Sequence, residues 1–295
     1  MPRLLRLSLS LLAVCCLLTM TTASAHQAGT VYMKINKAHA ARPHGSSNLA
    51  YRGGPVSVTA AVYIVFWGDW SNSTSAESYV TGFFGNVGGS AWGNSTKQYC
   101  QGTFNGATSC STSLPHPANA AKQLAGTWND TTNPVPASPT QSQIQAEAGN
   151  AAAFFGVTPN ANDDFMVFTP SGHSQNGFGT QWCAYHSSSG SLSYSYIPYQ
   201  PDAGASCGQN FVNGGSAGTF DGFSIVGGHE YAETITDPEP NSGWLDRQGS
   251  ENGDKCAWIA PGSGPGGATN ISLGGSNYAV QSLWSNAAGG CVTSS

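Results

Sequence analysis

Runs of β-branched and aromatic residues predict the strands of this chain. The longest run is VSVTAAVYIVFW at residues 56–67, and DFMVFT at 164–169 is a shorter one. Such runs between turn-forming segments are typical of buried strands. The same pattern predicts a strand pair at 181–186 and 192–199 and a last strand at 278–284.

Apolar residues at helical spacing predict helices between these strands. One helix follows a Thr-Ser-Ala-Glu capping box at 74–77. A second starts at the Ser-Pro pair 138–139, which suits the N-cap and the first helical position, and it ends at Gly156. A third covers about 224–236 and stops before Pro238, because a residue that precedes proline avoids the helical region.

This order of elements predicts an α+β domain in which a few helices pack on a mixed β-sheet. The 38 glycines and the polar segments between the apolar runs indicate a loop-rich structure. We expect residues 51–295 to form a single domain. Residues 26–50 are polar and lack a clear period, so we interpret them as a mobile N-terminal arm or a short pro-segment.

Residues 1–25 have the pattern of a secretory signal peptide. Arg3 and Arg6 precede an apolar stretch at residues 7–18, and Ala-Ser-Ala at 23–25 is a cleavage site. The stretch is too short to span a membrane. We therefore expect a secreted, extracellular protein with no membrane association after signal cleavage. A formal net charge of −5 and the lack of a basic patch argue against a nucleic-acid partner.

Six of the 8 cysteines remain after signal cleavage, and an even number in a secreted chain predicts disulfide bonds. The sequence contains no C-x-x-C pair, which argues against a zinc site made of four cysteines. Pairing of sequence neighbours predicts the bonds Cys100–Cys110, Cys183–Cys207 and Cys256–Cys291.

The strongest chemical signal is the sequence His-Glu-Tyr-Ala-Glu at residues 229–233. His229 and Glu233 are four positions apart, so on a helix they lie one turn apart on the same face. The pattern H-E-x-x-E resembles the H-E-x-x-H helix of zinc peptidases, with a carboxylate in place of the second histidine. Charged residues make up only 8% of the chain, so acids gathered close to this histidine indicate a cation site. These acids are Glu230, Glu233, Asp237, Glu239, Asp246, Glu251 and Asp254.

A catalytic zinc ion requires a third protein ligand and an open position. We favour Asp254, because a separate loop can approach the helix from any direction, whereas Asp237 would need a bend in the helix and Glu251 is a weaker choice. Glu230 is assigned as the general base that activates the metal-bound water. One histidine with two carboxylates accepts Zn²⁺, and it makes Mn²⁺ or Ca²⁺ more plausible than the two-histidine motif does.

Other features allow different interpretations. Residues 246–254 would also suit a structural calcium loop. His173 and His186 are either groups that line a cleft or hydrogen-bonded structural histidines. Exposed tryptophans would suit the binding of cell-wall polysaccharide, although core packing is favoured for Trp67 and Trp182. The candidates for such a surface are Trp67, Trp70, Trp92 and Trp182.

Several segments resemble the Exordium (phosphate-induced) family of secreted plant proteins. The resemblance depends on YRGGPV at 51–56, VYIVFWGDW at 62–70 and Phe-Phe at 83–84, and more loosely on 182–184, 234–238, 283–284 and Cys291. It implies the fold of that family, secretion and disulfide bonds, and the family has no settled catalytic activity. We interpret the chain as a microbial relative that carries a zinc-peptidase-like motif, whose chemistry depends on His229, Glu230 and Glu233 alone.

Together these features predict a secreted zinc metalloendopeptidase that acts on protein or peptide substrates, with a fold that is zincin-like by analogy. In this hypothesis His229, Glu233 and Asp254 hold the metal, and Glu230 is the catalytic base. The alternative is a non-enzymatic, Exordium-like extracellular protein that binds cell-wall glycan or a structural calcium ion.

Overall fold

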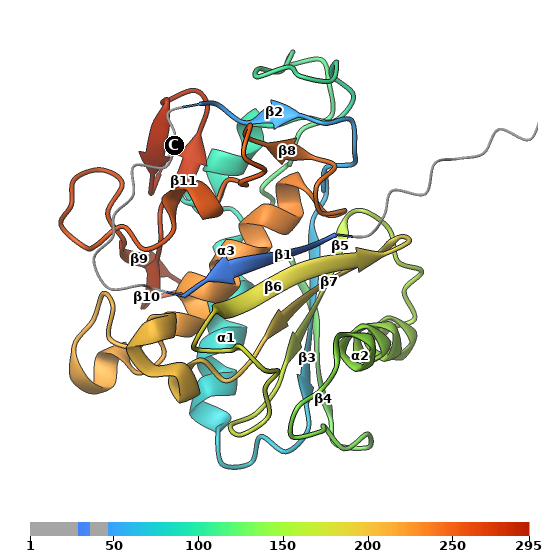
Figure 1. The fold of residues 1–295 in the computed structure, drawn as a ribbon, viewed down its shortest axis with the longest axis vertical. Coiled ribbons are helices and arrows are strands. Elements are labelled where there is room, and N and C mark those ends of the chain that lie inside the picture. The colour runs from blue at the N-terminus through green and yellow to red at the C-terminus, as the bar shows by residue number, and fades with distance from the viewer. Residues whose placement is uncertain (1–28, 36–46, 295) are drawn as a thin grey trace, which may run out of the picture.

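A mixed β-sheet is the centre of the computed structural model, which describes residues 29–35 and 47–294 (Figure 1). The predicted signal peptide, residues 1–25, lies outside the described residues. The sheet has six strands in the order β1-β6-β7-β5-β3-β4. Their bounds are β1 Thr30–Lys34, β3 Ala61–Trp67, β4 Leu124–Asp130, β5 Asp163–Phe168, β6 Trp182–Ser189 and β7 Leu192–Ile197.

Strands β7, β5, β3 and β4 run parallel to one another, while β6 and β1 are antiparallel additions at one edge. The strands β6 and β7 form a hairpin in which Tyr185 faces Tyr196. The predicted α+β class with a mixed sheet and the predicted strand pair are therefore confirmed.

Helices cover both faces of the sheet (Figure 1). Helix α2 (Gln141–Phe155) packs on β3, β5 and β7 on one face, and α1 (Thr74–Val87) and α3 (Asp221–Thr236) lie on the other. The alternation of side chains along β3 explains this division. Val65 and Trp67 enter the core under α2, whereas Ile64 and Phe66 enter the core that α1 and α3 share.

Helix α3 is buried along its whole length, because α1, the sheet and the C-terminal strands surround it. Its two adjacent glycines make this possible. A Cβ atom at Gly227 would lie 3.1 Å from the ring of Phe84, and one at Gly228 would lie 3.2 Å from the ring of Phe83. The bare backbone of α3 therefore allows the aromatic side chains of α1 to approach closely.

Smaller elements complete the side of the molecule around α3. A third apolar cluster there includes Leu49, Tyr99 and Trp244. The small strands are β2 Ala50–Tyr51, β8 Trp244–Leu245, β9 Thr269–Leu273, β10 Ser276–Val280, β11 Leu283–Ser285 and β12 Gly290–Val292. The short 3-10 helices are η1 Gly93–Gln98, η2 Gln200–Cys207, η3 Gly215–Gly218 and η4 Asp254–Cys256.

Helix α1 begins at Thr74 as predicted, but the caps of α1 and α2 differ from the predicted ones, and side-chain hydrogen bonds explain why. Helix α1 is preceded by Ser73 without a side-chain cap, and the carboxylate of Glu77 instead accepts a hydrogen bond from Asn129. Helix α2 starts at Thr140, which forms a reciprocal capping box with Gln143. The predicted end at Gly156 is confirmed, where φ is 68°.

Two strand predictions and the predicted N-terminal arm also differ from the structure. The run at 56–67 joins the sheet only from Ala61, because the backbone N–H of Ser57 bonds to Ile235 at the end of α3. The run at 278–284 breaks at Gln281, so β10 and β11 pair with different partners. Part of the predicted N-terminal arm, Thr30–Lys34, is the edge strand β1, while residues 26–28 and 36–46 lie outside the described residues.

The predicted disulfides Cys100–Cys110, Cys183–Cys207 and Cys256–Cys291 are all present. The surface of exposed tryptophans proposed for glycan binding is absent, because each of these tryptophans is buried in the core. Their exposed fractions are 4% for Trp67, 2% for Trp70, 1% for Trp92 and 7% for Trp182.

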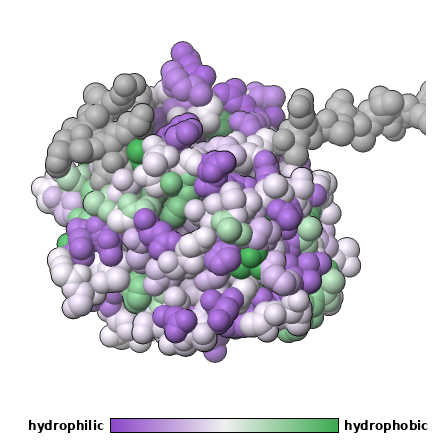
Figure 2. Space-filling model, turned by 60° about the horizontal axis from the view of Figure 1, so that its bottom comes forward, coloured by the Kyte–Doolittle hydropathy of each residue, from purple (hydrophilic) through white to green (hydrophobic). Residues whose placement is uncertain are grey.

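On the face seen in Figure 2, hydrophobic residues form separate areas among polar ones. Among the described helices, none combines the length and the apolar character that crossing a membrane requires.

Glu147 of α2 leads to a test of the fold. Burial is the main cause that raises the pKa of this carboxyl group from 4.5 to about 7, and the nearby Asp130 adds to the effect. The folded protein therefore binds an extra proton between these pH values, so the free energy of unfolding decreases as pH rises through this window. We expect Glu147→Gln, which cannot ionise, to be more stable than the wild type at pH 8 by on the order of 1–3 kcal/mol.

The measurement is urea unfolding of both proteins between pH 4 and pH 8. The two should have similar stability at pH 4, where the glutamate is protonated in both the folded and the unfolded chain. If the free energies of unfolding of the two proteins changed with pH in the same way over the whole range, the raised pKa of Glu147 would be contradicted.

Candidate metal centre

The H-E-x-x-E segment lies in the middle of α3, as predicted. One helical turn brings the Nε2 atom of His229 to 3.0 Å from the Oε1 atom of Glu233. Both side chains are fully buried. The motif therefore places an imidazole and a carboxylate together inside the protein.

Asp254 reaches the same point from the start of the 3-10 helix η4. Its Oδ1 atom lies 3.9 Å from His229 Nε2, and its backbone N–H donates a hydrogen bond of 2.9 Å to Glu233 Oε1. Ligand atoms of His229, Glu233 and Asp254 all lie within 4.8 Å of one another. The structure thus brings together the three side chains that the sequence nominates as metal ligands.

Gln281, in the break between β10 and β11, fixes the orientation of the His229 ring. The amide nitrogen of Gln281 donates to the carbonyl groups of Gly253 and Ser282 at 2.8 and 3.2 Å. Its Oε1 atom consequently faces His229 Nδ1 at 3.2 Å. Since an amide oxygen only accepts, this contact places a proton on Nδ1 and leaves Nε2, which faces the two carboxylates, as the nitrogen that a cation or a second proton would occupy.

The buried Nε2 atom of His229 makes no well-aligned hydrogen bond to any residue that the structure describes. Glu233 Oε1 lies 3.0 Å away as an ion-pair partner. Buried polar atoms are normally satisfied. A divalent cation would satisfy this one, and the set of one nitrogen and two carboxylates fits Zn²⁺, Mn²⁺ or Ca²⁺.

Glu230 points away from this triplet toward the sheet. Its Oε2 atom lies 3.2 Å from Nδ1 of His186 on β6, and its Oε1 atom has no hydrogen-bond partner within the described parts of the chain. The alternation along β6 explains why His186 faces α3. Its neighbour Tyr185 belongs to the core on the α2 side, so His186 projects to the opposite face.

Glu251, three residues before Asp254, lies on the other side of His186. Its Oε1 atom is 3.5 Å from His186 Nε2, and His186 Nδ1 is 3.6 Å from Glu233 Oε2. His186, Glu233 and Glu251 thus form a second triplet with ligand atoms within 4.8 Å of one another. Glu233 belongs to both triplets.

The two histidines and Glu233 support one another's charges. Burial opposes protonation of His229, but Glu233 outweighs it and raises the pKa of His229 to about 10. Burial likewise opposes the charged form of His186, and its hydrogen bond to Glu230 raises the pKa above its ordinary value. Burial also opposes ionisation of Glu233, yet His229 holds the pKa of Glu233 below its ordinary value.

The other acids of the centre resist ionisation. Burial raises the pKa of Glu251 well above its ordinary value, and the nearby Glu233 adds to this. Burial and then Glu233 raise the pKa of Asp254 to about 7. Burial raises the pKa of Glu230 as well, against the effect of the His186 hydrogen bond. All three would be stabilised as carboxylates by an added positive charge.

Access to the centre is narrow. His186, His229 and Glu233 have no exposed side-chain surface, and 22% of the Asp254 side chain is exposed. An open depression of about 500 Å³ next to α1 is lined by residues such as Glu77 and contains none of these groups. The centre therefore meets solvent through the edge that Asp254 occupies.

Other candidate residues have different partners. Asp237 ends α3 and accepts hydrogen bonds from the backbone N–H groups of Ser242 and Gly243, so it closes a turn. Asp246 accepts from backbone N–H groups and pairs with Lys255 at 3.0 Å, so it does not share a calcium loop with Asp254. His173 contacts the carbonyl oxygen of Pro136 and does not join the cluster.

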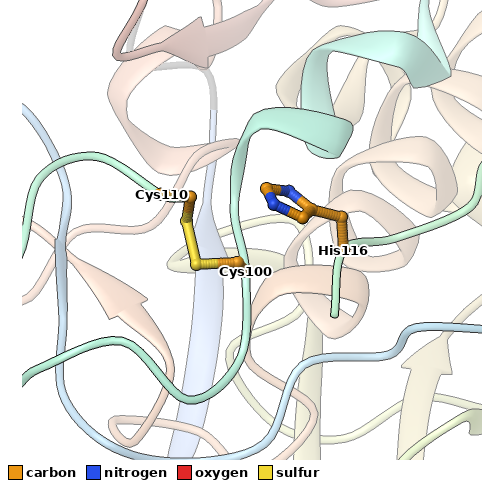
Figure 3. Close-up of side chains that lie close together, drawn as sticks. All are labelled: Cys100, Cys110 and His116. Carbon is orange, nitrogen blue, oxygen red and sulfur yellow. A yellow bond between two sulfur atoms is a disulfide. The ribbon is translucent and has the colours of Figure 1, made fainter. Parts of the chain in front are cut away.

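A third group of potential ligands, Cys100, Cys110 and His116, is not a metal site (Figure 3). The two cysteines form a disulfide, so neither offers a thiolate. The two ring nitrogens of His116 face the carbonyl oxygens of Lys97 and Ser111 at 2.8 and 3.0 Å. His116 therefore fastens the loop that the disulfide closes.

Sequence reasoning missed Gln281 and gave no role in metal binding to His186. The only sequence signal for His186 is its place in a strand, where a buried histidine requires a partner. Gln281 carries no signal, because a single glutamine after an apolar strand is ordinary. Glu251 was considered as a weaker third ligand, and the structure places it in the second triplet with His186.

No protein-family model, curated protein or solved structure matches the chain. The Exordium resemblance therefore remains a prediction, and the assignment of a function depends on the geometry of the centre.

Gly253 offers a steric test of the His229 triplet. A Cβ atom there would lie 2.7 Å from His229 Nδ1 and 3.0 Å from Glu233 Oε1, so Gly253→Ala must displace the histidine or the loop. We expect a loss of at least about tenfold in Zn²⁺ affinity, measured by competition with a chromogenic chelator. Gly149→Ala is the matched control, because a Cβ atom at that helical position has open space. Equal affinities of the two variants would contradict the proposed geometry.

Gln281→Leu tests the control of the His229 tautomer. The variant keeps a side chain of similar size but removes the acceptor for Nδ1, so we expect Zn²⁺ affinity to decrease about 10- to 100-fold. The control is Gln200→Leu, another buried glutamine, which bonds to the carbonyl groups of Cys183 and Pro198. If both variants bind Zn²⁺ like the wild type, Gln281 does not orient the ring.

Proposed function

We propose that this protein is a metal-dependent hydrolase in which His229, Glu233 and Asp254 hold a divalent cation. The observation that carries the proposal is the buried Nε2 atom of His229. It makes no hydrogen bond to the described residues, its proton is directed to the opposite nitrogen by Gln281, and two carboxylates face it. A buried ring nitrogen that faces two acids requires a positive charge beside them, and a divalent cation that displaces the proton from this nitrogen would supply it.

Zn²⁺ is the cation that we favour. Three protein ligands of nitrogen and carboxylate type leave one position of a tetrahedral zinc ion available, as catalytic zinc sites require. The excess of carboxylate over imidazole keeps Mn²⁺ and Ca²⁺ as alternatives, because both prefer oxygen ligands.

Glu230 is the residue that we assign to proton transfer. A bound cation supplies a Lewis acid that acidifies water and polarises a carbonyl group. The carboxylate of Glu230 is directed at His186 rather than at the His229 triplet, and its Oε1 atom has no hydrogen-bond partner in the described structure, so this atom is available to accept a proton from a water molecule that enters the centre. The pKa of Glu230, which burial raises, makes it a stronger base than an exposed glutamate. His186 holds Oε2 and thereby restricts the rotation of the carboxylate.

The finer proposal is a secreted endopeptidase that is zincin-like and acts on protein or peptide substrates. It is supported by the likeness of H-E-x-x-E to the zinc-peptidase helix. Three disulfides are typical of proteins from oxidising compartments, which supports an extracellular location. The substrate would approach at the edge of Asp254, the partly exposed ligand.

A second candidate is a non-enzymatic protein in which the cation is structural. The observation in its favour is burial, since five ionisable side chains of the centre have an exposed fraction of 0%. Structural metal sites are closed, whereas catalytic sites keep an open position. These five residues are His186, His229, Glu230, Glu233 and Glu251.

Glu230→Gln distinguishes the two candidates. The secreted protein should contain stoichiometric Zn²⁺ by elemental analysis and should cleave casein, and a chelator should abolish the cleavage. Glu230→Gln should retain its metal and lose at least about 100-fold in kcat, because an amide cannot accept the proton.

The control is Glu147→Gln, a buried glutamate that contacts Asn150 far from the centre, which should retain both metal and activity. A wild-type protein that holds zinc and is inert toward casein, with thermal stability that falls when the metal is removed, would support the structural candidate instead. A protein without bound metal would contradict both candidates.

A further inference from the structure

The geometry points to a second divalent-cation site, formed by His186, Glu251 and Glu233, with Glu233 bridging it to the cation held by His229 and Asp254. The inference deepens the proposed function and depends on it only for the first cation. It extends the centre from one metal ion to a pair, whose members share one carboxylate.

The unsatisfied atoms carry this inference. His186 Nε2, Glu233 Oε2 and both carboxylate oxygens of Glu251 are buried and make no hydrogen bond to any residue in the described ranges. The three side chains have an exposed fraction of 0%. Leaving one buried polar group unsatisfied costs about 1–3 kcal/mol, and more if the group is charged. Four such atoms on three side chains that lie within 4.8 Å of one another therefore indicate a missing positive charge.

Glu233 has the geometry of a bridging ligand. Its Oε1 atom lies 3.0 Å from Nε2 of His229, and its Oε2 atom lies 3.6 Å from Nδ1 of His186. Each oxygen thus faces a different histidine. A carboxylate that spans two cations uses its oxygens in this way, one for each ion.

One cation cannot satisfy both sets of ligands. Two ligands of a single Zn²⁺ ion lie no farther apart than about twice the ligand distance of 2.0–2.2 Å. Each triplet meets that requirement approximately, with ligand atoms within 4.8 Å of one another, but among the described residues the two do not merge into one group of five. The cluster therefore contains two convergence points.

The charges agree with two ions. Glu230, Glu233, Glu251 and Asp254 carry four negative charges when ionised, which two divalent cations with neutral histidines would balance. The nearby lysine, Lys255, is in an ion pair with Asp246 at 3.0 Å. Buried like charges are tolerated only with such compensation. Paired cations about 3.5–4 Å apart recur in hydrolases, where they stabilise both the attacking and the leaving oxygen.

The test is the number of zinc ions per chain. The full secreted protein is dialysed against ZnCl₂ and then against metal-free buffer, and its zinc content is measured by mass spectrometry. We expect two ions in the wild type, one in Glu251→Gln, one in Asp254→Asn and fewer than one in Glu233→Gln. Glu147→Gln, the buried control on the other face of the sheet, should retain two.

A second measurement gives its main result with the wild type alone. With Mn²⁺ alone, the wild type should give an electron paramagnetic resonance spectrum with magnetic exchange between two ions. Glu251→Gln, or His186→Gln if the former fails to fold, should show isolated Mn²⁺.

One zinc ion in the wild type, or an unchanged count in folded Glu251→Gln, would overturn the second site. Casein cleavage by a one-zinc protein would then leave the hydrolase proposal intact. Two ions without cleavage would establish the pair and reject the hydrolase.

Discussion

Like charges confined in the interior are the constraint on which this structure depends. Carboxyl groups from α3 and from the loop before η4 meet where solvent does not reach, with Glu233 in contact with both His186 and His229. Ions moved from water into a protein interior lose several kcal/mol of solvation each. The chain accepts much of this cost around Glu233, where imidazole groups stand between the acids. Such an arrangement persists when function requires it.

The fold brings these groups together from three separate parts of the chain. Helix α3 supplies a rigid row of side chains, and the strand β6 beside it projects His186 toward that row. The loop at 251–254 closes over the other side, held by the hydrogen bond from Asp254 N–H to Glu233. Gln281 joins this loop to His229, because it contacts both Gly253 and the ring. Local structure alone explains the contact of His229 with Glu233, and tertiary packing explains the others.

The sequence alone was sufficient to predict a structural feature where the pattern behind that feature is local. The period of the apolar residues predicted the class of fold, the β6–β7 hairpin and the helix that bears the motif, and neighbour pairing predicted the three disulfides. It failed where the partner is distant. The capping of α1 was misjudged because Glu77 bonds to Asn129 on another strand, and Gln281 could not be recognised because its role comes from the ring that it meets. His186 was noticed, but its position relative to Glu251 follows only from the packing of β6 on α3.

Two covalent bonds hold the parts of the centre that do not belong to α3. The Cys183–Cys207 bond lies three residues from His186, and the Cys256–Cys291 bond lies two residues from Asp254. Cross-links that close segments of 24 and 35 residues restrict the unfolded chain by roughly 3–4 kcal/mol each. They also limit how far a local opening can separate these side chains from the helix. Under reducing conditions the helix would keep His229 and Glu233 in register, while His186 and Asp254 would lose the cross-links that hold them nearby. The redox state of the surroundings in which the chain matures therefore helps to determine whether the polar cluster assembles.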